Sequence, residues 1–136
     1  MPNQELDQNQ CNAIRKRLAM TDAQIAKGES QRQMASNTLR QTQNQLMQER
    51  TQLNALMKDK MMAESMSNAA TTEAVDSTEA TNAAVKISVI EARIEMLESE
   101  EARILRDIEN FDKQLSDMRS SREANAAEAT RLNCVI

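Results

Sequence analysis

The chain has 136 residues, with one Gly, one Pro, one Phe and no His, Trp or Tyr, and its formal net charge is −4. Without histidine there is no imidazole base or imidazole metal ligand, and a single glycine cannot build a phosphate-binding loop. A single aromatic residue cannot form a stacking platform for bases or sugars. The composition therefore argues against an enzyme. No residue is a candidate for catalysis, cofactor binding or metal binding.

The acidic balance also argues against nucleic acid as a partner, because nucleic acid selects a basic face. No stretch approaches the roughly 18 apolar residues of a transmembrane helix, so we expect no transmembrane segment. The first residues lack the apolar region of a cleavable signal peptide. We therefore expect a chain that is either cytoplasmic or exported without a cleavable signal peptide.

The first expected element is a long helix over residues 1–67 with a polar N-terminal tip. Its sequence is rich in Gln and carries a strict seven-residue repeat of mostly large side chains. A second repeat, three residues further on, holds mostly small or polar side chains. The large repeat comprises Cys11, Leu18, Ile25, Arg32, Leu39, Leu46, Leu53 and Lys60, and the small repeat comprises Ile14, Thr21, Gly28, Ala35, Thr42, Glu49 and Leu56. Such a lopsided stripe indicates half of an interface whose other half is bulkier.

A turn is expected at residues 68–76, within a stretch of small and polar residues that favours helices only weakly. Asn68 could cap the end of the first helix, and Asp76 with Glu79 could form a capping box for the second. The stretch contains no Gly or Pro, so a continuous helix or a partly disordered link over residues 63–86 remains an alternative.

The second expected element is a long helix over residues 77–136, and its 3-4 spacing is typical of a coiled coil. Twelve of fifteen positions in this stripe are apolar, and the stripe is strongest over residues 87–118. Arg122 and Asn125 interrupt it, which costs stability but helps to fix register. For the two helices together, the expected helix–helix seam comprises Leu18, Ile25, Leu39, Leu46, Leu53, Leu56, Ile87, Ile90, Ile94, Leu97, Ile104, Ile108, Phe111, Leu115, Met118 and Leu132.

Charge and side-chain size both predict that the two helices pair antiparallel. Residues 1–62 carry nine basic and six acidic groups, whereas residues 87–136 carry seven basic and eleven acidic groups. A turn centred near residue 73 sets Gly28 against Met118 and Ala35 against Phe111, so that small residues meet large ones. Glu49 opposite Leu97 fits this register poorly. The predicted fold class is all-α, a long antiparallel two-helix coiled-coil hairpin that assembles further into a helical oligomer.

The two ends of the chain carry the remaining candidates. Cys134 falls two residues past Leu132, at an outward position of the heptad, so two free thiols are favoured over a disulfide with Cys11. Arg15, Lys16 and Arg17 form a basic run expected on a solvated face. The apolar C-terminus gives a candidate assembly contact, which comprises Leu132, Val135 and Ile136.

The polar start MPNQELDQNQ, the long helical hairpin and the apolar end Val135-Ile136 resemble the helical filament subunits of type III secretion systems. The resemblance covers the layout of the whole chain and transfers no catalytic residue. It implies a structural protein that self-assembles through helix–helix seams as a homo-oligomer or filament. The stalk and chaperone proteins of the same machinery are similar in size and layout. They give the alternative, a cytosolic adaptor or chaperone that binds a helical protein partner or an ATPase.

Overall fold

The computed structural model describes residues 2–69 and 75–135, with side chains described for residues 8–65 and 81–135. Helix α1 spans Pro2–Ala69 and helix α2 spans Val75–Arg131, and the described residues contain no strand. The predicted all-α class is confirmed. The expected turn at 68–76 falls where α1 ends and α2 begins, but residues 70–74 lie outside the described residues. The side chains of Asn68, Asp76 and Glu79, which were expected to cap the helices, lie outside them as well.

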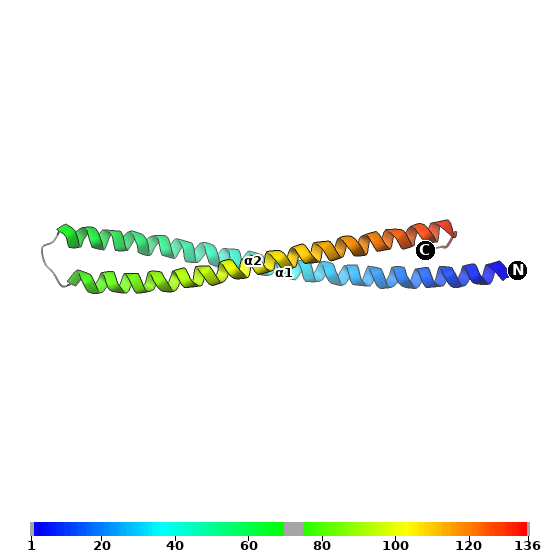
Figure 1. Ribbon diagram of the computed structural model, residues 1–136, viewed down its shortest axis with the longest axis horizontal. Helices are drawn as coiled ribbons and strands as arrows, with labels where there is room; N and C mark the ends of the chain where they lie inside the picture. Colours follow the sequence, from blue (N-terminus) through cyan, green and yellow to red (C-terminus); the bar gives the residue numbers. More distant parts are fainter. Residues whose placement is uncertain (1, 70–74, 136) are drawn as a thin grey trace. The chain divides into compact units, whose positions relative to one another are not determined.

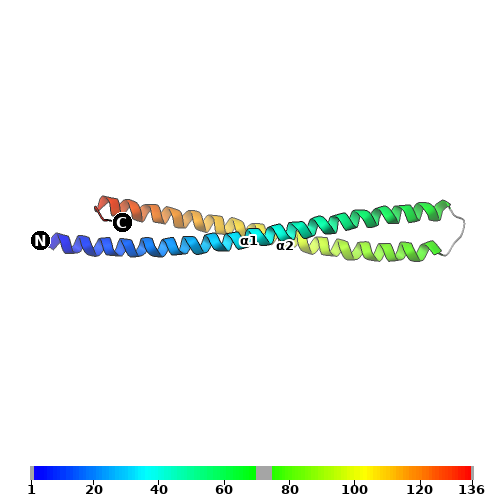
Figure 2. The same cartoon turned by 180° about the vertical axis from the view of Figure 1, so that it is seen from behind.

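The chain divides into two units, and both helices contribute to each. Unit 1 comprises residues 1–36 and 106–136, and unit 2 comprises residues 37–105. Within each unit α1 and α2 lie side by side and run in opposite directions (Figures 1 and 2). The predicted antiparallel pairing of two helices is therefore confirmed.

The predicted seam is the part of each helix that the other helix covers. Every predicted seam position from residue 11 to residue 60 and from residue 87 to residue 132 is buried or half-buried. In unit 1 the best-covered cluster joins Ile14 and Leu18 to Ala129. In unit 2 Leu46 packs with Ile90 and Ile94. Because each helix has only one partner, many seam side chains, Phe111 among them, remain half-buried.

Gly28 shows how small and large residues alternate across the seam of unit 1. A Cβ atom on Gly28 would lie 3.0 Å from Leu115 Cδ2 and 3.3 Å from Met118 Cε. The register predicted Met118 as the opposite residue, and this contact confirms it. Gly28 has no positive φ angle, so its value lies in the space that it leaves for the other helix.

Among the residues with described side chains, six ion pairs connect α1 to α2, as the unlike charge of the two helices predicts. In unit 1 they are Arg17–Glu128, Asp22–Arg122, Glu29–Arg119 and Arg32–Asp112, and in unit 2 they are Glu49–Arg93 and Arg50–Glu98. Arg32 donates hydrogen bonds to both carboxylate oxygens of Asp112, and this contact raises the pKa of the guanidinium above its ordinary value. Exposed pairs of this kind contribute about 0–1 kcal/mol each. They favour one register over others more than they add to stability.

Two polar seam positions have partners that the sequence did not reveal. Arg122 donates a hydrogen bond to Asp22, so its charge does not lie unpaired in the seam. Glu49 lies 3.9 Å from Arg93 through Oε1, but its Oε2 is buried and accepts no hydrogen bond. Leaving such an oxygen without a donor costs about 1–3 kcal/mol. The poor fit of Glu49 opposite Leu97 is therefore a real weak point of unit 2.

Replacing Gly28 tests the close approach of the two helices. Gly28→Ala should change stability little, because the gain in helix propensity, up to about 1 kcal/mol, is offset by crowding against Leu115 and Met118. Gly28→Leu should destabilise the protein by about 1–3 kcal/mol through overpacking. Chemical denaturation followed by circular dichroism measures both, with the exposed Ala26→Leu as the control. A Gly28→Leu variant as stable as that control would contradict the observed packing.

Replacing Glu49 tests the buried oxygen. Glu49→Met should raise the free energy of unfolding by about 1 kcal/mol, because it removes an unsatisfied acceptor and packs a similar volume into the seam. Arg93→Met should instead lower the free energy of unfolding, because it leaves the Glu49 carboxylate in the seam without the cation that pairs with it. Equal losses in the two variants, measured by thermal denaturation, would show that the ion pair is worth more than its desolvation cost.

Candidate assembly site

The C-terminal end of α2 is closed by a turn that the sequence analysis did not predict. Asn133 has a φ angle of 57°, in the left-handed region that Asn tolerates better than most residues. The Asn133 N–H donates to the Thr130 carbonyl at 3.1 Å, and the Cys134 N–H donates to the Ala129 carbonyl at 2.8 Å. These two bonds define a Schellman motif, which ends the helix and turns the chain back on itself. The helix therefore ends at Arg131 and not at residue 136.

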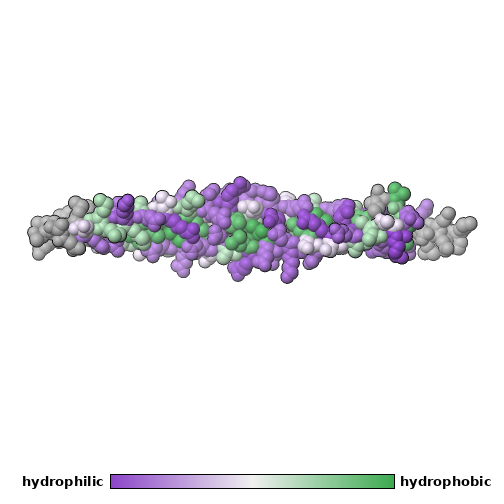
Figure 3. Space-filling model, turned by 90° about the horizontal axis from the view of Figure 1, so that it is seen from above, coloured by the Kyte–Doolittle hydropathy of each residue, from purple (hydrophilic) through white to green (hydrophobic). Residues whose placement is uncertain are grey.

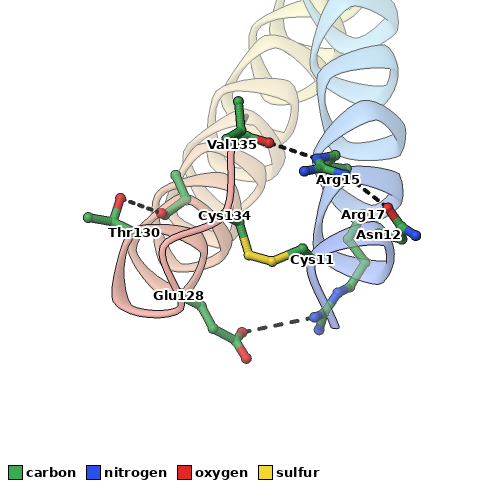
Figure 4. Close-up of a disulfide and its surroundings, with 9 residues drawn as sticks. Cys11, Asn12, Arg15, Arg17, Glu128, Thr130, Cys134 and Val135 are labelled. Carbon is green, nitrogen blue, oxygen red and sulfur yellow. Dashed lines mark hydrogen bonds and ion pairs between the residues drawn. A yellow bond between two sulfur atoms is a disulfide. The ribbon is translucent and has the colours of Figure 1, made fainter. Parts of the chain in front are cut away.

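This turn makes the prediction of two free thiols wrong. Cys11 and Cys134 form a disulfide with a Cα–Cα distance of 5.5 Å (Figure 4). The prediction placed Cys134 on an uninterrupted helix, where it would point outward. In the structure, the left-handed Asn133 carries Cys134 across to α1, where it packs against the cluster of Ile14, Leu18 and Ala129. Two sequence signals pointed to this bond: the predicted register places residues 11 and 134 at nearly the same level, and an Asn, which tolerates the left-handed region, directly precedes Cys134.

Arg15 fixes the last described residue beside the disulfide. Its Nε atom donates to the Val135 carbonyl at 2.7 Å, and its NH1 group donates to Asn12 Oδ1 at 2.9 Å (Figure 4). Arg17, from the same basic run, pairs with Glu128 at 4.0 Å. The basic run of Arg15, Lys16 and Arg17 was predicted to lie on a solvated face. Through Arg15 it also holds the backbone that follows α2 in place, a role that sequence reasoning missed.

The three residues predicted as an assembly contact differ in how far they are exposed. Leu132 is half-buried and packs against the cluster of Ile14, Leu18 and Ala129. Val135 is 78 % exposed, so most of its side chain is open to solvent beside the disulfide. Ile136 lies outside the described residues. Of the predicted contact, Val135 is thus the described residue with apolar surface available to another molecule.

Further large apolar side chains lie outside the seam. Green hydrophobic side chains reach the surface in separate places between purple hydrophilic ones (Figure 3). The most exposed are Met96 at 74 %, Met61 at 70 % and Met47 at 67 %. Single exposed apolar residues are common on protein surfaces, so none of them is a site by itself.

Among residues 2–69 and 75–135, no cluster of three or more Cys, Asp or Glu side chains is placed to hold a metal ion. Neither helix, in its described part, has a stretch apolar enough to cross a membrane. No protein-family model matches the chain, and neither a curated protein nor a solved structure shows a significant match.

The disulfide should stabilise the protein substantially, because it joins two cysteines with a sequence separation of 123 and so closes a long loop. Replacing both cysteines by Ser should lower the free energy of unfolding by about 3–5 kcal/mol. Denaturation with and without a reducing agent measures this: the reductant should destabilise the wild type and leave the double variant unchanged. A wild type that responds no more than the double variant would show that the thiols are free in solution.

Proposed function

We propose that this chain is a structural protein that self-assembles through helix–helix contacts, as a subunit of an exported filament. The observation that carries the proposal is the backbone segment at Val135, which contacts beside the disulfide hold in place. There the disulfide and Arg15 hold the backbone, and the Val135 side chain stays 78 % exposed. An apolar side chain on a fixed backbone can bind another subunit without the entropic cost of ordering a flexible segment.

The disulfide supports export as the setting for this assembly. Disulfides persist in oxidising compartments and are rare in the reducing cytosol. A cytosolic adaptor or chaperone would have to function with Cys11 and Cys134 reduced, and so without the bond that holds its ends together. This argument favours the filament subunit over the cytosolic adaptor. It also agrees with the layout that the resemblance to exported helical filament subunits implies.

Self-association should depend on concentration and on Val135. Sedimentation velocity and negative-stain imaging from about 1 µM to about 1 mM should show species that grow with concentration, as mass action requires. Val135→Asp should reduce this growth, because a carboxylate would have to be desolvated in the contact. Asn12→Asp, an added carboxylate near the disulfide, is the control, because Asn12 already binds the Arg15 guanidinium, which can pair with the new charge. A wild type of constant small mass would contradict the proposal and favour an adaptor.

A further inference from the structure

Residues 132–135, which follow α2, are tied to α1 by two bonds of very different strength. Cys134 is joined covalently to Cys11, and the Arg15 guanidinium donates a hydrogen bond to the Val135 carbonyl at 2.7 Å (Figure 4). We call residues 132–135 the tethered segment. The hydrogen bond is exposed, so water competes for it, whereas the disulfide persists until it is reduced.

The apolar contacts beside the tethered segment are few and small. The buried cluster here consists of Ile14, Leu18 and Ala129, with Leu132 partly buried against it. The turn also places Asn133 in the left-handed region, which costs energy for any residue with a Cβ atom. Without the disulfide, the segment would therefore depend on a small apolar cluster and an exposed hydrogen bond, and it would open readily.

The disulfide lies where a reducing thiol can reach it. Cys134 is half-buried, in contrast to Cys11 at 8 % exposure, and both line an open hollow with Asn12, Arg15 and Val135. Disulfides are reduced by a thiolate that attacks one of the two sulfur atoms. The positive charge of Arg15 at the same hollow favours the approach of such an anion. The Cys134 sulfur is the more accessible point of attack.

Resting on the proposed self-assembly, we propose that this disulfide is a redox switch that controls it. In the oxidised chain, Val135 sits on a fixed backbone and binds another subunit. Reduction by a dithiol releases the tethered segment, so that association has to order it again, at an entropic cost. Assembly is then favoured in an oxidising compartment and disfavoured in a reducing one.

The reduction balances as an exchange between two dithiols. One thiolate of the reductant attacks Cys134 Sγ, the S–S bond breaks, and Cys11 leaves as a thiolate that takes up a proton. The second thiolate of the reductant then displaces Cys134 from the mixed disulfide, and Cys134 is protonated in turn. The protein gains two electrons and two protons, and the reductant loses both and becomes a disulfide.

The contacts farther from the disulfide in unit 1 do not depend on it. The ion pairs Asp22–Arg122 and Glu29–Arg119 and the close approach of Gly28 to α2 all involve residues within the two helices. Reduction breaks none of these contacts. We therefore expect the reduced chain to keep its antiparallel helix pair and to open only beside the disulfide.

Amide hydrogen exchange, followed by NMR with and without dithiothreitol, tests the release of the segment. The Cys134 N–H, bonded to the Ala129 carbonyl at 2.8 Å, should exchange about tenfold faster or more after reduction. The Leu115 N–H, in the middle of α2, is the internal control and should change by less than about twofold. Equal exchange at Cys134 in both redox states would overturn the release, and an equal rise at Leu115 would show general unfolding in its place.

Sedimentation equilibrium of the same samples tests the control of assembly. Reduction should weaken the dissociation constant for self-association by about tenfold or more. Cys11→Ser combined with Cys134→Ser should associate as weakly as the reduced wild type, with or without dithiothreitol. Wild type that associates equally in both redox states would overturn the switch and leave self-assembly intact. An oxidised wild type that never associates would overturn the proposed function and the switch together.

Discussion

The fold depends on one constraint: each helix can bury apolar surface only against the other. A two-helix pair has no third layer, so the seam is narrow and its side chains are covered on one side only. This is why Phe111 and Leu97 stay half-buried although they occupy central seam positions. The chain compensates by repeating the contact over many heptads and by setting small residues opposite large ones, as at Gly28 and Leu115. Unlike charges beside the seam then favour a single register.

The same constraint explains the disulfide. In an antiparallel pair, contacts near the connection close short loops, whereas contacts at the free ends close the longest ones. Residues 11 and 134 are 123 positions apart in the sequence, so bringing them together carries a large entropic cost. The cluster of Ile14, Leu18 and Ala129 is small, and an end held only by it would fray readily. The disulfide holds α1 and the segment after α2 together at this point, where the apolar cluster is too small to do so alone.

The seam and the register could be predicted from sequence because they depend on periodicity, size and charge, all of which are visible in the residues. The end of α2 could not, because it depends on the backbone angle of one residue. A left-handed Asn133 replaces the helix by a turn and moves Cys134 from an outward position to the side of Cys11. Heptad counting assumes that the helix continues, so it assigned the cysteine to the wrong face. The pairing of Arg122 with Asp22 was not predicted for a different reason: the long arginine side chain reaches a partner outside the seam.

The narrow seam also determines where a partner can bind. Because α1 and α2 use their apolar stripes on each other, a further subunit must bind to their outer surfaces or to the fixed end at Val135. The charged outer surface of α2 would have to lose water from several carboxylates, which is expensive unless each finds a cation. The distribution of charge between the two helices thus favours the antiparallel register within the chain, and any further subunit would have to bind without leaving the charges that α2 presents desolvated and unpaired.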